Sequence, residues 1–381
     1  MAGAMLFPSR RLRATPFTAR VSTSGVSGYT VYNHMLLPTV FEDLQADYKH
    51  LKENVQIWDV SVERQVQLLG KDAHKLACLI SARDLTNAQI GRCYYAPICD
   101  QSGAIINDPI ALRLAEDKYW FSIADSDLLL WVQGIALGLD LNVEVCEPDV
   151  SPLAIQGPLA EDLMADVFGE EIRNVKFFHF KEFPFKGRML NIARSGWSKQ
   201  GGFEIYLNDT QLGTELWDAI WEKGKKYNIR AGCPNLIERI EAGLLSYGND
   251  MNREDTPLEI GLEKYISLDS EVDFIGKKAL LKQREDGIKK RLMGIVMDGS
   301  EMPPLTMPEE VLIGGKNIGF VTSAVYSPDC NGNIGFAMIE ASNANADTEV
   351  SVRSKTGIRK ARLCEIGDFW TQVQPKNSIF G

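Results

Sequence analysis

The sequence has few residues of the kinds that bind metals or form disulfides. Four histidines occur among 381 residues, and the seven cysteines are dispersed without a CxxC pair. Structural zinc sites and disulfide frameworks depend on closely spaced cysteines and histidines. We therefore predict neither a metal site nor a disulfide framework.

The chain also lacks an excess of basic residues and any long apolar run. Its 41 lysines and arginines stand against 51 acidic residues, which gives a net charge of −10 and does not favour a nucleic-acid partner. No apolar stretch reaches the roughly eighteen residues of a membrane span. The N-terminal RRLR is not followed by the apolar core of a signal peptide. We expect a cytoplasmic protein with no membrane partner.

The length of the chain exceeds that of one ordinary domain. Helix-like and strand-like segments alternate up to about residue 285, and residues 91–124 among them read as three strands. Beyond that point nearly every segment reads as a strand, broken by Gly, Asn and Asp turns: KRLMGIVMDG, EEVLIGG, IGFVTSAVYS, IGFAMIEA, EVSVRS and RKARLCEIG. This pattern predicts a small closed β-domain at the C-terminal end.

The stretch SGWSKQGGFEIYL, residues 195–207, combines a strand pattern with polar side chains. Phe203, Ile205 and Leu207 fall on one face of a period-2 strand, and Glu204 and Tyr206 fall on the other. One interpretation is an edge strand with a solvated outer face. The other is the wall of a binding site that presents the polar face, together with Trp197, to a flat ligand. The pattern alone leaves both open.

Several segments occur in an order that resembles a known family: IWDVSVERQVQLLGKDA, YYAPICDQSGAIINDPI, SPLAIQGPLAEDL, GCPNLIERIEAGLLSYGNDM, LEIGLEKYISLD, FIGKKALLKQREDG and GFVTSAVYSPDCNGNIGFAMI. Together they are similar to the folate-dependent aminomethyltransferases, which include the glycine cleavage T-protein. The resemblance implies an α+β, three-domain cloverleaf with folate bound centrally. It divides the chain into a discontinuous folate-binding domain (1–55 and 150–284), an α+β domain (56–149) and a β-barrel domain (285–381).

Within that family, SRRLRATPF, YTVYNHMLLPTVF and CPNLIERIEAG resemble the dimethylsulfoniopropionate demethylase branch. Glycine-cleavage members tend to carry Arg-Asp where this chain has Asn235-Leu236. The resemblance implies methyl transfer from a sulfonium substrate to tetrahydrofolate, with tetrahydrofolate as the methyl-accepting cosubstrate. Two alternatives stay open: an aminomethyltransferase that acts on a lipoyl-protein-bound intermediate, and a non-catalytic folate-binding protein. The oligomeric state is also open, with a homodimer as one option.

The resemblance also assigns candidate folate-binding residues. Glu204 matches the family's pterin-binding carboxylate, and a carboxylate can accept both hydrogen bonds from the two-pronged donor edge of a pterin. Asp108 matches an acid beside the reacting nitrogens of folate, and it is the candidate catalytic residue. Tyr95, Phe178 and Trp197 are the remaining candidates for folate contact. The structural alternatives are a turn acid before a proline for Asp108 and core packing for Phe178.

Trp197 and Tyr206 are also the candidate substrate-binding residues, with ordinary cross-strand packing as the competing role for Tyr206. An aromatic face can attract a sulfonium cation. The sulfonium is already an activated leaving group, so a direct displacement by N5 of tetrahydrofolate needs no nucleophilic Ser, Cys or Lys. This agrees with the absence of a recognisable triad or nucleophile-elbow motif in the sequence.

Overall fold

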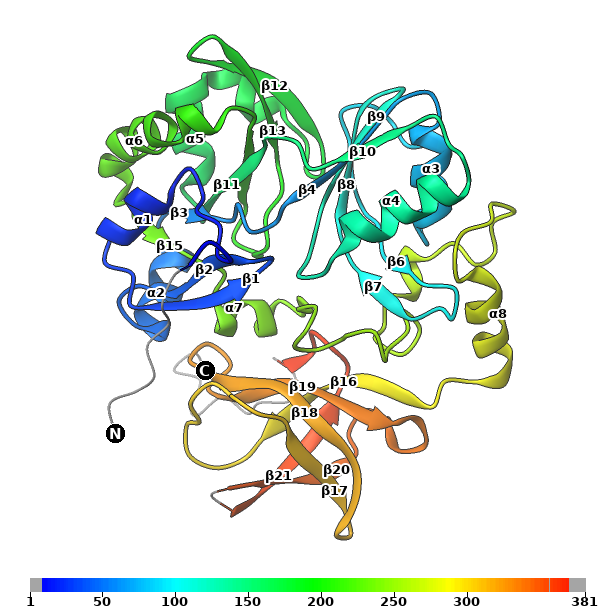
Figure 1. Cartoon of the computed structure of the whole chain (residues 1–381). Coiled ribbons are helices and arrows are strands. Elements are labelled where there is room, and N and C mark those ends of the chain that lie inside the picture. Colours follow the sequence, from blue (N-terminus) through cyan, green and yellow to red (C-terminus); the bar gives the residue numbers. More distant parts are fainter. Residues whose placement is uncertain (1–8, 356, 370–381) are drawn as a thin grey trace.

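The computed structural model describes residues 9–355 and 357–369. Two larger sheets lie side by side, and a barrel lies beneath them in the view of Figure 1. The helices are α1 (Thr18–Thr23), α2 (Leu44–Glu53), α3 (Ala73–Ile80), α4 (Leu128–Gly138), α5 (Ala160–Phe168), α6 (Gly213–Gly224), α7 (Leu236–Glu241) and α8 (Lys277–Asp286). The α+β class with a C-terminal barrel is confirmed.

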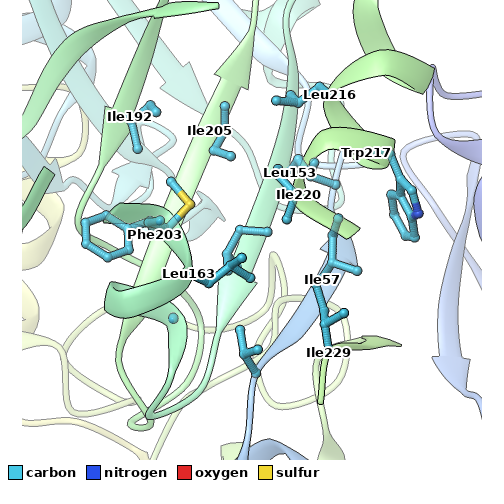
Figure 2. Close-up of a cluster of buried hydrophobic side chains, with 14 of the residues drawn as sticks. Ile57, Leu153, Leu163, Ile192, Phe203, Ile205, Leu216, Trp217, Ile220 and Ile229 are labelled. Atoms are coloured by element: carbon cyan, nitrogen blue, oxygen red, sulfur yellow. The ribbon is translucent and has the colours of Figure 1, made fainter. Parts of the chain in front are cut away.

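The first large sheet has six strands. Their order is β12 (Phe180–Phe185), β13 (Arg188–Ala193), β14 (Gly202–Leu207), β11 (Ser151–Gln156), β3 (Gln56–Asp59) and β15 (Arg230–Gly232). Its apolar face is covered by α5 and α6, and Figure 2 shows the side chains that fill this core. Phe203 and Ile205 of β14 meet Leu163 of α5 and Leu216 and Ile220 of α6 there. Each fully buried side chain of this size contributes about 1.5–3 kcal/mol to stability.

The second large sheet has five strands, in the order β10 (Glu144–Cys146), β4 (Gln65–Leu69), β9 (Lys118–Ser122), β8 (Ile110–Ala115) and β5 (Cys93–Tyr95). Helices α3 and α4 pack on it through an apolar cluster that includes Leu76, Ala77 and Val132. The structure has five strands between residues 91 and 124, where we expected three. The two additional ones, β6 (Ile98–Cys99) and β7 (Ile105–Asn107), form a short hairpin of their own.

The chain crosses from the first large sheet to the second between β3 and β4, as Figure 1 shows. Strand β3 pairs with β11 and β15, so the crossing begins after Asp59. The buried strand Gln56–Asp59, which we assigned to the second domain, thus pairs within the first large sheet. The division into domains stays a prediction.

The C-terminal barrel is closed. Its strands follow the order β16 (Lys290–Met297), β19 (Gly332–Glu340), β18 (Lys316–Ser327), β17 (Glu309–Ile313), β20 (Glu349–Ser354) and β21 (Gly357–Cys364), and β21 pairs back to β16. Ile237 and Ile240 of α7 pack with Phe336 and Met338 of β19 in one buried cluster. The barrel is thereby joined to the rest of the molecule through α7 (Figure 1).

Two helices are shorter than the sequence pattern predicts. The segment 39–55 reads as one amphipathic helix, but Thr39 and Val40 end β2 (Met35–Val40), which pairs with β1 (Gly28–Tyr32), before α2 begins. The segment 235–247 also reads as one helix, but α7 ends at Glu241. Gly243 follows with a φ of +71°, a conformation that commonly terminates helices.

No helix among the described residues has the length and apolarity to cross a membrane.

Candidate functional site

The polar face of β14 is buried. Glu204 is 7% exposed and Tyr206 is 1% exposed. The strand lies between β13 and β11, where Glu204 is opposite Ala193 and Ala154. The interpretation of a solvated edge strand is therefore wrong, because β14 is an interior strand with covered faces.

The Glu204 carboxylate is held by hydroxyl groups. Ser195 Oγ donates to its Oε2, and the Tyr206 hydroxyl lies 3.5 Å from the same oxygen. Within the described residues no cation pairs with this carboxylate, and no donor reaches Oε1. Burial raises the pKa of Glu204, and the two hydroxyl contacts oppose that rise. The carboxylate thus keeps acceptor capacity for a ligand.

Asp108 is a second acid with unused acceptor capacity. It follows β7, and its Oδ2 accepts a hydrogen bond from the Tyr95 hydroxyl at 3.0 Å. Its Oδ1 is buried and has no partner among the described residues. Burial raises the pKa of Asp108 to about 7, although the bond from Tyr95 lowers it. The preceding Asn107 differs, because its amide is fully engaged with Ala124 and Ser126.

Glu63 is a third acid at this place, and the sequence analysis missed it. It lies in the crossing between β3 and β4. Burial raises its pKa well above the ordinary range, and the negative charges of Glu204 and Asp108 raise it further. The pattern DVSVERQVQLLG reads as one continuous strand, which gave Glu63 no distinguishing feature. Glu63 is thus within electrostatic reach of both other acids, and none of the three forms an ion pair with a described lysine or arginine. Together they form the candidate site, hereafter the acid cluster (Glu63, Asp108 and Glu204).

The tip of the β1–β2 hairpin approaches the acid cluster. Burial and the charges of Glu63 and Asp108 raise the pKa of Tyr32. Asn33 follows it with a φ of +46° and anchors the turn, because its side chain donates to the carbonyl oxygens of Val62 and Ala124 at 3.0 and 3.1 Å. Tyr32 is therefore a further candidate site residue. The period-2 pattern around the turn gave no reason to select it.

Aromatic side chains surround the same place. The ring centroids of Tyr206 and Trp120 are 6.0 Å apart, and Phe178 packs against this cluster. Tyr95 makes an edge contact with Tyr265 at 4.7 Å. The Tyr206 ring thus takes part in cross-strand packing, as one of the two expected roles had it, and its hydroxyl faces Glu204. A role for Tyr206 in substrate binding stays a prediction.

Trp197 lies two residues beyond the Ser195 that holds Glu204. Its ring is half-buried, and the Arg239 guanidinium carbon lies 5.9 Å from the ring centroid. The structure therefore brings Tyr95 into direct contact with Asp108, and Phe178 and Tyr206 into the packing beside Glu204. Trp197 is placed at the side of α7.

This arrangement suits a flat ligand that carries several N–H donors. Two carboxylates offer oxygens without partners, and aromatic rings lie close to both. A model of the GCVT N-terminal domain matches residues 17–270, and a model of the glycine cleavage T-protein C-terminal barrel domain matches residues 290–366. The chain belongs to the glycine cleavage T-protein family.

Two curated members of this family illustrate its range. The chain is 51% identical to the dimethylsulfoniopropionate demethylase DmdA of Ruegeria pomeroyi over 367 residues, which is 96% of this chain and all of that protein. It is 30% identical to an aminomethyltransferase of Alkaliphilus metalliredigens over 334 residues, 86% of this chain and 89% of the other.

The family fold is also seen in a solved structure. The glycine cleavage system aminomethyltransferase T from Bartonella henselae superimposes with a TM-score of 0.84 at 21% identity, covering 93% of this chain and 98% of that one. This likeness confirms the T-protein fold.

Asn235, where we expected a departure from the glycine-cleavage members, has a clear structural role here. Asn235 begins α7, and its side-chain oxygen accepts from the backbone N–H groups of Ile237 and Glu238. Its amide nitrogen also donates to the Leu44 carbonyl oxygen at the start of α2. Asn235 is thus a helix cap that joins two helices, an arrangement that an arginine could not reproduce.

Proposed function

We propose that this protein transfers a methyl group from dimethylsulfoniopropionate to tetrahydrofolate and yields methylmercaptopropionate and 5-methyltetrahydrofolate. The 51% identity to the Ruegeria pomeroyi demethylase over 96% of the chain supports this donor, since the aminomethyltransferases match at 30–31%. The single observation that supports the acceptor is the presence of two carboxylates with unused oxygens, the buried Glu204 and the half-buried Asp108, whose Oδ1 atom is buried.

The role proposed for Glu204 is to hold the pterin ring. The 2-amino group and the adjacent ring N–H of a reduced pterin point in the same direction, as two donors. A carboxylate buried beside hydroxyl groups accepts both with charge-assisted hydrogen bonds. These bonds also favour the ionised form of Glu204 and offset the cost of its burial. Tyr95 and Phe178 are proposed to flank the folate rings.

The proposed reaction is a direct displacement. Tetrahydrofolate supplies N5, whose lone pair forms the new N–CH3 bond. The C–S bond breaks, its electrons return to sulfur as a neutral thioether, and the N5 proton is released. Positive charge thus moves from sulfur to nitrogen. The protein's contribution is to align the three atoms and to exclude water, which is a proximity effect.

Asp108 is proposed to stabilise the positive charge that develops on N5 during the transfer. Its Oδ1 has no partner among the described residues, and Tyr95 fixes the other oxygen. An ionised carboxylate at this position stabilises a developing cation without moving during the reaction. Trp197 and Tyr206 are proposed to face the sulfonium, which an aromatic ring can attract.

Product analysis tests this function. Purified protein is incubated with tetrahydrofolate and, in separate reactions, with dimethylsulfoniopropionate or an aminomethylated lipoyl carrier protein. We expect 5-methyltetrahydrofolate and methylmercaptopropionate in the first reaction, detected by mass spectrometry. Methylene-folate formed only in the second reaction would identify an aminomethyltransferase instead. Folate binding without either product would indicate a non-catalytic binding protein.

We further propose a cytoplasmic location and keep the homodimer as one option. The partners proposed are the sulfonium substrate and folate. Light scattering of the purified protein measures the oligomeric state directly.

A further inference from the structure

The loop that joins β13 to β14, hereafter the site loop (residues 194–201), carries two residues of the proposed site. Ser195 donates a hydrogen bond to Glu204, and Trp197 is proposed to face the sulfonium. The site loop contains no strand or helix, so side chains of other elements must hold it in place. Two buried side chains, one from β11 and one from α7, do so.

Gln156, the last residue of β11, holds the first half of the site loop. It is fully buried, its Nε2 donates to the Ser195 carbonyl oxygen at 3.2 Å, and its Oε1 accepts from Ser198 Oγ at 2.8 Å. A Cβ atom at Gly196 would lie 2.1 Å from Nε2 of this side chain, so only glycine allows the close approach. The position of Ser195, and with it the contact to Glu204, is thus set from the first large sheet.

Glu238, in the first turn of α7, holds the second half of the site loop. Its Oε1 accepts from the Lys199 backbone N–H at 2.7 Å and from Gln200 Nε2 at 3.3 Å. The side chain is 2% exposed, and its Oε2 is buried without a partner among the described residues. Burial raises the pKa of Glu238, whereas the two bonds lower it. An apolar side chain of this size would avoid the cost of burying a carboxylate but could not hold the loop.

The next residue of α7 contacts the ring of Trp197. The Arg239 guanidinium carbon lies 5.9 Å from the centre of that ring. This guanidinium is itself fixed, because it donates to Asp250 and to Ser323 of β18, each at 2.8 Å. Trp197 is therefore held at its ring by Arg239 and through the loop backbone by Glu238. Both contacts come from α7, which packs on the barrel.

We infer that Glu238 is a positioning residue, which fixes the site loop so that Trp197 faces the sulfonium. This inference rests on the proposed function. The hydrogen bonds of Glu238 go to the part of the loop beyond Trp197, whereas Glu204, the proposed partner of folate, is held by Ser195. The loss of Glu238 should therefore weaken the binding of the sulfonium and leave the binding of folate intact.

Limited digestion with trypsin measures how readily the site loop opens, because Lys199 is an exposed cleavage site within it. Glu238→Met keeps the length of the side chain and removes both acceptor oxygens. Cleavage after Lys199 should become about tenfold faster, as for the loss of a hydrogen bond to a charged group. Glu238→Gln keeps an acceptor oxygen for the loop and should be cleaved like the unmodified protein. Cleavage after the exposed Lys186, between β12 and β13, is the internal control and should be equal in all three proteins.

Kinetics of methyl transfer by the same variants test the role of the loop in substrate binding. For Glu238→Met we expect the KM for the sulfonium to rise about tenfold, with unchanged kcat and unchanged tetrahydrofolate affinity by calorimetry, and Glu238→Gln should restore the KM. Glu238→Ala is a second variant without an acceptor and should behave like Glu238→Met, with the fold of both checked by circular dichroism.

Unchanged cleavage after Lys199 in the Met and Ala variants would overturn the inference. Faster cleavage with an unchanged KM would also overturn it, because Glu238 would then stabilise the loop without affecting the substrate. If the unmodified protein transfers no methyl group, the proposed function fails, whereas faster cleavage after Lys199 would still show that Glu238 holds the site loop.

Discussion

The carboxylates at two places in the molecule differ in whether their oxygens have hydrogen-bond and cationic partners. Asp250 is 2% exposed and accepts four hydrogen bonds, from Arg239, the Ser246 N–H, Thr322 and Ser323. Its ion pair with Arg239 measures 2.8 Å and links α7 to β18 of the barrel. In the acid cluster, by contrast, no cation compensates the carboxylates among the described residues, and burial raises the pKa values of all three.

The difference distinguishes an acid that stabilises the fold from acids that can bind a ligand. A buried acid whose oxygens are all engaged contributes to holding elements together, and its removal leaves other polar groups unpaired. A buried acid with a free oxygen destabilises the folded protein until a ligand or a proton arrives. Acids with a raised pKa, an unused oxygen and no cationic partner therefore indicate a binding site, whereas Asp250 indicates a structural contact between the barrel and α7.

The largest expected effect comes from removing the ion pair between Asp250 and Arg239. Asp250→Ala leaves Arg239 buried without its partner, so the free energy of unfolding should fall by about 3–5 kcal/mol. Glu204→Gln removes a buried charge that has no cationic partner and should leave stability nearly unchanged. Urea denaturation of both variants measures this contrast. Equal losses in the two would show that the acid cluster is as structural as this ion pair.

The next effect concerns the rate of methyl transfer. Asp108→Asn keeps the shape of the side chain and removes its charge, so the single-turnover rate at saturating folate should fall about 10²–10³-fold and stay measurable. Rapid-quench methyl transfer, with folate occupancy determined separately, gives this rate. No transfer at all by a folded and fully occupied variant would show that Asp108 performs obligatory proton chemistry.

A smaller effect concerns folate affinity. Glu204→Gln replaces one acceptor oxygen with a donor NH2 group that would face a pterin N–H. The loss of a charge-assisted bond in a buried site should weaken folate binding by about 1.5–3 kcal/mol. Calorimetry measures the affinity, with Glu182→Gln on the exposed side of β12 as the control. Unchanged affinity would remove Glu204 from the proposed site.

The smallest effect is a shift in pH dependence. Because the pKa of Asp108 is raised to about 7, its carboxyl is neutral below that pH, and kcat/KM should rise as the pH increases through about 7. The Tyr95 hydroxyl lowers this pKa, so Tyr95→Phe should move the rise upward by about 0.5–1 pH unit. A shift of this rise to lower pH, or no shift, would show that kcat/KM does not depend on the ionisation of Asp108.

Much of the scaffold could be predicted from local patterns. The alternation at Phe203–Leu207 gave the two faces of β14 correctly, and the run of short strands after residue 285 gave the barrel. The position of β14 inside the sheet could not be predicted in this way, because strand order depends on contacts between distant segments.

The site was less predictable for the same reason. Glu204 and Asp108 were selected by resemblance, and the structure supplied what makes them unusual, namely oxygens without partners. Glu63 and Tyr32 come from a crossing segment and a hairpin tip, where period-2 patterns carry no information about neighbours.

The β1–β2 hairpin has a consequence for how such an enzyme changes over evolutionary time. It forms a two-stranded sheet of its own, whereas β14 is paired on both sides. Substitutions in the hairpin strands therefore leave the backbone pairing of both large sheets intact, although Tyr32 at the hairpin tip is electrostatically coupled to Asp108. A lineage can alter the hairpin, and with it the electrostatic surroundings of Asp108, while the interior strand that carries Glu204 stays intact. The surroundings of the two acids are thus able to diverge at different rates.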